Sequence, residues 1–195
     1  MKVPVGILIS GRGSNMLSLI EAAKAPDYPA EIVLVLSNRE TAPGLHLAAQ
    51  HGIPTIAVAS KAFGADREAH ERAVQGELVR AGVQVVCLAG YMRLLTPYFV
   101  GQWAGRMLNI HPSLLPKYPG LETHQRVLEA GDKIHGCTVH VVTDGMDEGP
   151  IVGQAEVAVL PGDTEESLAK RVLAAEHLLF PRALKDFLKR DKNTT

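Results

Sequence analysis

Two polar side chains with complementary chemistry lie two residues apart in this sequence, the carboxamide of Asn109 and the imidazole of His111. They end the strand-like run "RMLNIH", and alternate side chains of a strand point to the same face of a sheet. Pro112 follows at once and stops the strand. A hydrogen-bond donor beside a proton carrier suits acyl transfer, which must stabilise an oxyanion and move a proton. An ordinary polar strand end explains the same pair, so the choice depends on the rest of the chain.

The loop from Asp144 to Gly149 supplies acids that could pair with His111. Its three carboxylates lack the spacing of an EF-hand calcium loop, and they are Asp144, Asp147 and Glu148. One of them could favour the charged imidazolium, although an acidic surface turn has the same composition. The other histidines of this region show no metal-ligand spacing, and they are His124, His135, His140 and His177. His140 alternates with apolar residues on a strand, which is typical of a structural histidine. No metal site is predicted.

A glycine-containing loop joins the first expected strand to the first expected helix. It contains Gly11, Gly13, Ser14 and Asn15. Glycines let backbone amides approach a ligand, and the N-terminus of a helix favours an anion. Met16 occupies the place of the third glycine in a dinucleotide fingerprint, so a single phosphate fits the loop better. The alternative is a plain strand–helix turn with Ser14 as the N-cap.

A further apolar segment follows the fourth expected strand, in "LAGYMRLL". Gly90 lets the chain turn at the edge of the sheet. Met92, Leu94 and Leu95 beside it could face a flat aromatic ligand or belong to the core. Arg67, in "GADREAH", is expected on the surface of a helix.

The first half of the chain alternates short β-branched runs with longer amphipathic segments, a pattern that predicts a parallel sheet wrapped by helices. The expected strands are Val3–Ile9, Ile32–Leu36, Thr55–Val58 and Val83–Ala89. The expected helices are Ser14–Lys24, Gly44–Gln50 and Asp66–Arg80. In such sheets ligands bind beyond the carboxyl ends of the strands. Four polar or glycine residues fall at such ends, namely Ser10, Gly90, Asn109 and Thr143.

The pattern changes after Leu95. We expect strands at Arg106–Ile110, Ile134–Val142 and Ile151–Val159, and helices at Glu122–Ala130 and Thr164–Lys189. The last helix should be capped by Asp163 or Thr164, with Glu166 making the reciprocal contact, and should be kinked or restarted at Pro181. The prediction is therefore one α/β domain over residues 1–195. It has a Rossmann-like parallel sheet in approximately residues 1–100 and a mixed sheet in residues 101–195.

The composition is that of an ordinary globular protein, with 195 residues, 46% hydrophobic, 21% charged and a net charge of −1. The balanced charge argues against a nucleic-acid binder that works by neutralising phosphates. No apolar run approaches the roughly 18 residues of a membrane span, and no signal peptide is recognisable. Cys87 and Cys137 lie in apolar runs and are expected to be buried, reduced thiols of a cytoplasmic protein, although a disulfide between them stays open.

Taken in order, these motifs resemble the phosphoribosylglycinamide formyltransferase family of purine biosynthesis. The resemblance runs from "ILISGRGSN" through "LAGYMRLL" and "NIHPSLLPKYPGLETH" to "DEGPIVGQA" and "AEHLLFP". It implies the formyltransferase fold and transfer of a formyl group from the co-substrate 10-formyltetrahydrofolate to the amine of 5'-phosphoribosylglycinamide. The implied partners are these small molecules, with no metal, nucleic acid or membrane, and a homodimer is compatible with the resemblance.

The resemblance also implies roles for individual residues. The catalytic residues would be Asn109, His111 and Asp147. The phosphoribosyl substrate would contact Gly13, Ser14, Asn15 and Glu176. The folate would contact Arg67, Met92, Arg93, Leu94, Leu95 and Asn109. On this basis residues 1–100 form the phosphate-binding half and residues 101–195 the catalytic and folate-loop part. One departure is Leu173, which stands where a Lys or Gln is expected in relatives and leaves more of the phosphate contact to the Gly13–Asn15 loop.

Three alternatives remain at the level of the sequence. Methionyl-tRNA formyltransferase is expected to need an additional C-terminal domain and a basic surface. Formyltetrahydrofolate deformylase is expected to carry an N-terminal regulatory domain, whereas the first strand here begins at Val3. A non-catalytic folate- or nucleotide-binding module would not need Asn109, His111 and Asp147 together.

Overall fold

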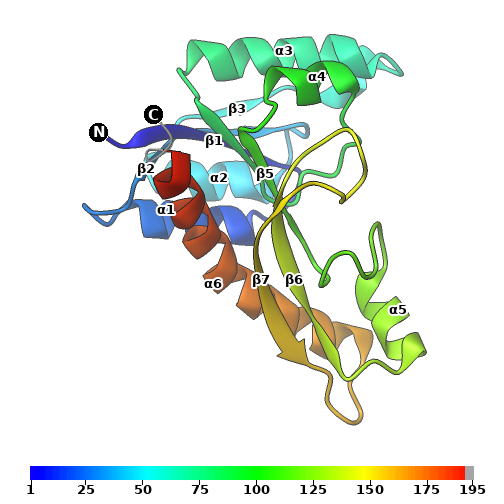
Figure 1. Cartoon of the computed structure of the whole chain (residues 1–195). Coiled ribbons are helices and arrows are strands. Elements are labelled where there is room, and N and C mark those ends of the chain that lie inside the picture. Colours follow the sequence, from blue (N-terminus) through cyan, green and yellow to red (C-terminus); the bar gives the residue numbers. More distant parts are fainter. Residues whose placement is uncertain (192–195) are drawn as a thin grey trace.

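One mixed sheet organises the part of the chain that the computed structural model describes, residues 1–191 (Figure 1). Its strands are β1 (Val3–Ile9), β2 (Ala30–Ser37), β3 (Thr55–Ala57), β4 (Val85–Leu88), β5 (Met107–His111), β6 (Ile134–Val141) and β7 (Ile151–Ala158). They lie in the order β3-β2-β1-β4-β5-β6-β7. The pairs from β3 to β5 are parallel, and the pairs β5–β6 and β6–β7 are antiparallel. The predicted α/β domain, with a parallel first half and a mixed second half, is confirmed.

Helices cover both faces of the sheet (Figure 1). One face carries α1 (Ser14–Ala23), α2 (Pro43–Gln50), α5 (Thr123–Ala130) and α6 (Glu165–Asp191), and the other carries α3 (Arg67–Arg80) and α4 (Pro97–Gln102). A short 3₁₀ helix, η1 (Ser60–Phe63), precedes α3. None of the helices within residues 1–191 is long and apolar enough to cross a membrane.

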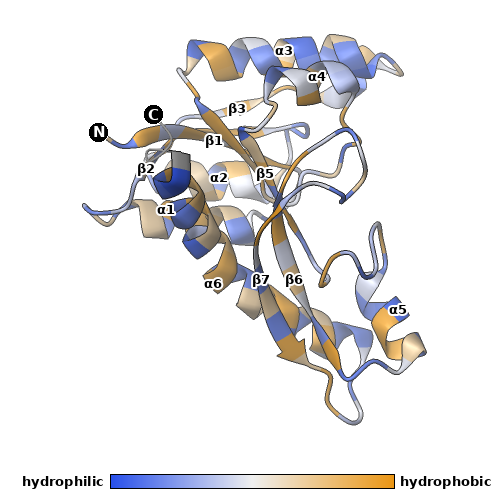
Figure 2. Ribbon diagram, in the orientation of Figure 1, coloured by the Kyte–Doolittle hydropathy of each residue, from blue (hydrophilic) through white to orange (hydrophobic). Residues whose placement is uncertain are grey.

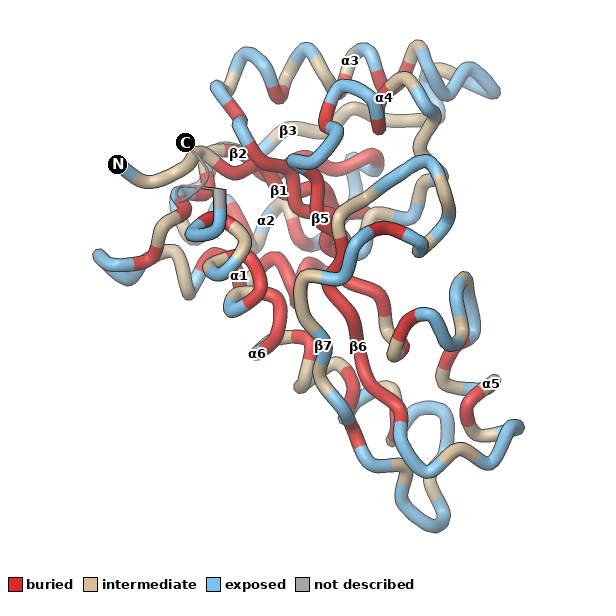
Figure 3. Tube along the Cα trace, viewed as in Figure 1, coloured by how far each residue is buried: buried red, intermediate tan, exposed pale blue. Residues whose placement is uncertain are grey.

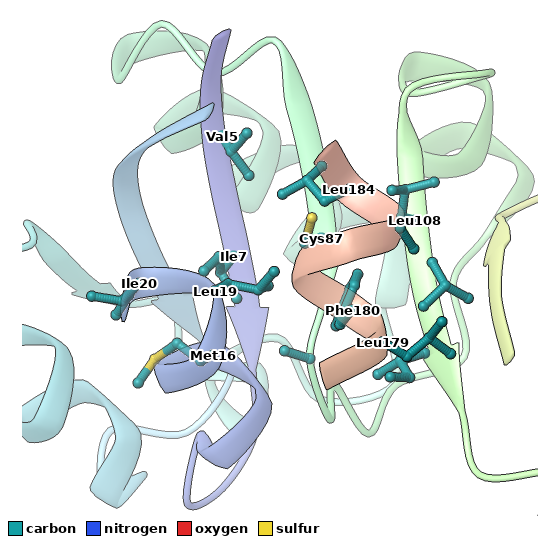
Figure 4. Close-up of a cluster of buried hydrophobic side chains, with 14 of the residues drawn as sticks. Val5, Ile7, Met16, Leu19, Ile20, Cys87, Leu108, Leu179, Phe180 and Leu184 are labelled. Carbon is teal, nitrogen blue, oxygen red and sulfur yellow. The ribbon is translucent and has the colours of Figure 1, made fainter. Parts of the chain in front are cut away.

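The core consists of two buried clusters, one on each side of the sheet. β1 supplies both, because Val5 and Ile7 face α1 and α6, whereas Leu8 faces α3 and α4. This is the alternation expected of a strand that is buried on both faces. Figure 4 shows the first cluster, in which Met16 and Phe180 approach the sheet from α1 and α6.

Burial is uneven across the sheet. β5 and most of β6 are buried, whereas β7, the edge strand, is largely half-buried or exposed (Figure 3). Figure 2 shows that β1 is hydrophobic along most of its length, whereas α3 mixes hydrophilic and hydrophobic residues. The central strands of the sheet are therefore buried, whereas its edge strand β7 is partly open to solvent.

The last helix differs from its prediction in two respects. α6 is one continuous helix with Pro181 inside it, so Pro181 does not restart it. The carbonyl of Pro181 accepts a hydrogen bond of 2.7 Å from the hydroxyl of Tyr28, which ties the helix to the loop before β2.

The reciprocal capping contact of α6 involves Ser167 and not Glu166. Thr164 Oγ1 accepts from the Ser167 N–H at 3.2 Å, and Ser167 Oγ accepts from the Thr164 N–H at 2.9 Å. A capping box joins the N-cap to the third residue after it, and Glu166 is one position too early. Asp163 instead binds Arg171, and this contact, with the Leu160 N–H, holds the pKa of Asp163 below its usual value.

Two short elements, η1 and α4, were not predicted. α4 begins with Pro97 at its first helical position, which Pro favours. The backbone N–H and the hydroxyl of Thr96, the N-cap, both donate to the buried carboxylate of Glu71 on α3. This helix start is thus fixed by a tertiary contact, and local sequence periodicity is too short there to reveal it.

Adjacent leucines on α6 test how this helix is packed. Leu179 is 1% exposed and Leu178 is 79% exposed. We expect Leu179→Ala to lower the free energy of unfolding by about 2–5 kcal/mol, because it leaves a cavity against the sheet. We expect the control, Leu178→Ala, to change it by less than about 0.5 kcal/mol. Urea unfolding measures both, and equal losses would contradict the packing described here.

Candidate active site

The site lies where the parallel and antiparallel parts of the sheet meet. β4 ends with Leu88 opposite Asn109, whereas β6 continues alongside β5 and places Thr138 opposite His111. Asn109 and His111 line a pocket of about 600 Å³. The rest of its wall comes from α1, the Gly90–Met92 turn, the loop before α5 and α6. The predicted position of these two side chains at a strand end is confirmed.

The imidazole of His111 is buried between two oxygen atoms. Its Nε2 lies 2.9 Å from the carbonyl oxygen of Tyr118, which can only accept, so Nε2 carries a proton. Its Nδ1 lies 3.5 Å from Oδ2 of Asp147. The ring is 6% exposed, and its orientation is therefore set by protein contacts.

Asp147 reaches this histidine from the loop between β6 and β7. Its backbone is in the left-handed region, with φ 55°, and its Oδ2 accepts a 2.9 Å hydrogen bond from the Gly120 N–H. Burial by itself raises the pKa of this carboxyl. The adjacent His140 ring, the hydrogen bond from the Gly120 N–H and the charge of His111 together outweigh burial, and the pKa of Asp147 lies below its usual value. Asp147 is therefore an anion at neutral pH.

A buried acid forms the opposite wall of the pocket. Asn15 Nδ2, on α1, donates a 3.0 Å hydrogen bond to Oε2 of Glu176, on α6. Burial raises the pKa of Glu176, and the hydrogen bond from Asn15 opposes this only in part. Asn15 Oδ1 is buried without a hydrogen-bond partner in residues 1–191. Unpaired buried acceptors are costly, so this wall is suited to a ligand that donates N–H groups.

The glycine loop borders the same wall, because Asn15 belongs to both. Gly13 is the N-cap of α1, with φ 74°, and Ser14 is the first helical residue, as the predicted helix start requires. The alternative, in which Ser14 is the N-cap of a plain turn, is therefore not what forms. No side chain caps this helix start, which leaves its backbone N–H groups available for an anion. A Cβ on Gly13 would lie 2.8 Å from Met16 Cε and 3.2 Å from the Cα of Gly44. Only glycine fits this turn without strain.

The residues expected to contact a folate are less concentrated. Met92 lines the pocket and is 62% exposed. Four others do not line it, namely Arg67, Arg93, Leu94 and Leu95. Arg67 is exposed at the start of α3, and Leu95 packs against the second core cluster. The structure thus brings together Asn15, Met92, Asn109, His111 and Glu176, with Asp147 behind His111.

Several pocket residues were not predicted, namely Tyr91, Glu122, Thr123, His124 and Glu165. His124 Nδ1 lies 3.0 Å from His135 Nε2. Burial lowers the pKa of His124, and burial with the neighbouring histidines lowers that of His135 to about 4. The sequence signal for this wall is the position of the "THQRVLEA" helix after the end of β5, because ligands bind beyond the carboxyl ends of strands in such sheets.

Cys87 and Cys137 are both buried and free, so no disulfide joins them. Within residues 1–191, no group of three or more His, Cys, Asp or Glu side chains is placed to hold a metal ion.

Comparisons of sequence and of structure with known proteins both match this chain to formyltransferases. The formyl transferase family model matches residues 3–184. Phosphoribosylglycinamide formyltransferase of Escherichia coli is 47% identical over 181 residues, which are 93% of this chain and 85% of that protein. The trifunctional purine biosynthetic protein adenosine-3 of Drosophila melanogaster is 50% identical over 182 residues, and the chain spans only 13% of its length.

Solved structures of phosphoribosylglycinamide formyltransferases have the same fold as this chain. The crystal structure of phosphoribosylglycinamide formyltransferase from Brucella melitensis has 55% identity and a TM-score of 0.92, with 96% of each chain covered. Glycinamide ribonucleotide transformylase 1 from Symbiobacterium toebii has 43% identity and a TM-score of 0.93, with 97% of this chain and 89% of that one covered. The chain belongs to the formyl transferase family.

Proposed function

We propose that the protein transfers a formyl group from 10-formyltetrahydrofolate to the amine of 5'-phosphoribosylglycinamide, a step of purine biosynthesis. Family membership supports the class of reaction, and the identity with the Escherichia coli enzyme supports the acceptor. The observation that carries the proposal is the contact of His111 with Asp147 beside Asn109, at a pocket whose far wall is the buried acid Glu176.

The proposed catalysis stabilises a negative oxygen. When the amine attacks the formyl carbon, the formyl oxygen becomes an oxyanion. The N–H groups of Asn109 and a protonated His111 bind it, and the Asp147 carboxylate stabilises the imidazolium. The 3.5 Å distance from His111 Nδ1 to Asp147 exceeds a normal hydrogen bond, which leaves the Nδ1 proton available to a ligand oxygen. A free amine is already a nucleophile, so no covalent intermediate with the enzyme is needed. The intermediate collapses when the bond from the formyl carbon to the folate nitrogen breaks. Asp147 helps to pass the proton lost by the attacking amine, through water, to that leaving nitrogen.

The two substrates occupy different parts of the site in this proposal. The phosphate lies on the backbone amides of Gly13, Ser14 and Asn15 at the start of α1, and the amine donates to Glu176. The folate lies along the Met92–Leu95 segment, with the guanidinium of Arg67 toward its carboxylate-bearing tail. Met92 supports this best, because it is exposed at the pocket.

The division of labour follows the two parts of the chain. Residues 1–100 bind the phosphate and supply Arg67 and the Met92–Leu95 segment for the folate. The rest of the described chain supplies the catalytic residues, the loop that carries Asp147, and Glu176. The partners are small molecules, with no nucleic acid and no membrane, and the protein works in the cytoplasm. A homodimer is compatible with this arrangement.

Mixing the protein with a formyl-folate analogue and glycinamide ribonucleotide tests the function, with the folate absorbance as the readout. We expect deformylation only when the ribonucleotide is present, and formylglycinamide ribonucleotide in equal amount. Deformylation without an acceptor would indicate a hydrolase instead. Binding of both ligands without turnover would indicate a non-catalytic module.

Asp147→Asn tests the catalytic group, because it keeps the size of the side chain and removes its charge. We expect turnover to fall at least about a hundredfold, since both the oxyanion and the proton-transfer contributions weaken. Binding of glycinamide ribonucleotide should stay nearly normal. Near-normal turnover at neutral pH would mean that Asp147 is only a loop residue.

Gly13→Val tests the phosphate loop. The added side chain meets Met16 and Gly44 in a backbone conformation that valine avoids, so the amides should no longer fit a phosphate. Calorimetry should show a much larger loss of affinity for glycinamide ribonucleotide than for a folate. Gly76→Val is the control, because a Cβ at Gly76 has open space around it. Equal losses for both ligands would make the loop a structural turn.

A further inference from the structure

We propose that His140 is a positioning residue, whose Nε2 holds the carboxamide of Asn109 with an N–H directed at the reacting oxygen. The inference rests on the proposed function, in which Asn109 stabilises the oxyanion. It goes beyond that function because His140 does not line the pocket and acts only through its neighbour.

The geometry begins with the pairing of two strands. His140 on β6 lies directly opposite Asn109 on β5 in the antiparallel ladder. Side chains at opposed positions share one face of a sheet and are close enough to interact. Asn109 Nδ2 and His140 Nε2 are 3.3 Å apart, and His140 is 2% exposed.

The other nitrogen of the ring decides which atom donates. His140 Nδ1 lies 3.1 Å from the carbonyl oxygen of Val141, which can only accept, so Nδ1 carries the proton. In the neutral ring Nε2 then has a lone pair and accepts from Asn109 Nδ2. If the carboxamide were turned over, its oxygen would face that lone pair, and the two acceptors would repel each other. His140 therefore selects one of the two orientations of the Asn109 amide.

The remaining neighbour of the ring is Asp147. Its Oδ1 is 3.7 Å from His140 Nε2, which is too long for a hydrogen bond, so Asn109 is the partner of this nitrogen. The selected amide has two N–H groups, and one is used by His140. The Asn109 side chain has no further hydrogen bond within residues 1–191, which leaves the second N–H for a ligand oxygen in the pocket.

A close backbone approach keeps the ring in place. A Cβ on Gly149 would lie 1.6 Å from the carbonyl oxygen of Val141 and 3.4 Å from His140 Nδ1. Only a glycine lets the loop pass so near, and the next carbonyl, that of Pro150, accepts from the Val141 N–H at 2.9 Å. The loop that carries Asp147 thus also covers the acceptor that fixes the His140 tautomer.

Two substitutions of His140 distinguish the role of its Nε2 from the role of its Nδ1. In His140→Gln the amide oxygen can reach the place of Nε2 and accept from Asn109. In His140→Asn the amide can reach the place of Nδ1 and still donate to Val141, but no acceptor faces Asn109. We expect His140→Asn to lower kcat at least about tenfold, because a disordered oxyanion donor loses part of the hundredfold or larger effect of such donors. KM for glycinamide ribonucleotide should change less than about threefold, since uniform binding is untouched. His140→Gln should keep most of kcat.

A double-mutant cycle with Asn109→Ala completes the test. In that background His140→Asn should lower kcat by less than about twofold, because its effect passes through a carboxamide that is gone. An equal factor in both backgrounds, or an equal loss of kcat in the Gln and Asn variants, would overturn the proposal and leave His140 a packing residue. Near-normal kcat for Asn109→Ala alone would instead refute the role of Asn109 in the proposed function. Unfolding midpoints of all variants show that the comparison is made between folded proteins.

Discussion

The site depends on one strand that is parallel to its neighbour on one side and antiparallel on the other. β4 stops opposite Asn109, and β6 continues past it to His111, so the sheet is complete on one side of His111 and open on the other. Helix and loop segments fill this opening incompletely, and the remaining space is the pocket. The change of strand direction also brings β6, with His140, and the loop with Asp147 back to the same edge. A wholly parallel sheet would send that loop to a helix on one of its faces.

Burial of polar groups then limits how the site can be arranged. His111, His140, Asn15 and Glu176 are each less than 10% exposed. Each of them has a protein partner, because a buried polar group without one is costly. Among the side-chain atoms of these four residues, the amide oxygen of Asn15 has no hydrogen-bond partner within residues 1–191, and Asn15 lines the pocket. The hydrogen-bonded side chains fix the walls of the pocket. The free acceptor of Asn15 is where a ligand can donate a hydrogen bond.

The sequence was sufficient for the elements and for one side of the site. Long apolar runs predicted every strand boundary to within two residues, and the twofold period of a strand placed Asn109 and His111 together. The conformation of a loop has no such period, so the contact of Asp147 with His111 followed only from resemblance. His140 was interpreted as a structural histidine, because its opposition to Asn109 depends on a register that is set by a long intervening segment. α4 was not predicted, because its start is fixed by a hydrogen bond to Glu71, a residue distant in sequence.

Within residues 1–191, three residues other than glycine have a positive φ, namely Tyr118, Glu122 and Asp147. Glu122 lines the pocket, and the other two contact His111. Such conformations cost roughly 1–3 kcal/mol each, and they persist only where the surroundings enforce them. Glycine at these positions would relieve that cost and would also give the loops more conformations to lose when a ligand binds. The strained residues therefore make the ligand-free pocket rigid in advance. Part of the entropy that a flexible pocket would lose on binding is already lost when the chain folds.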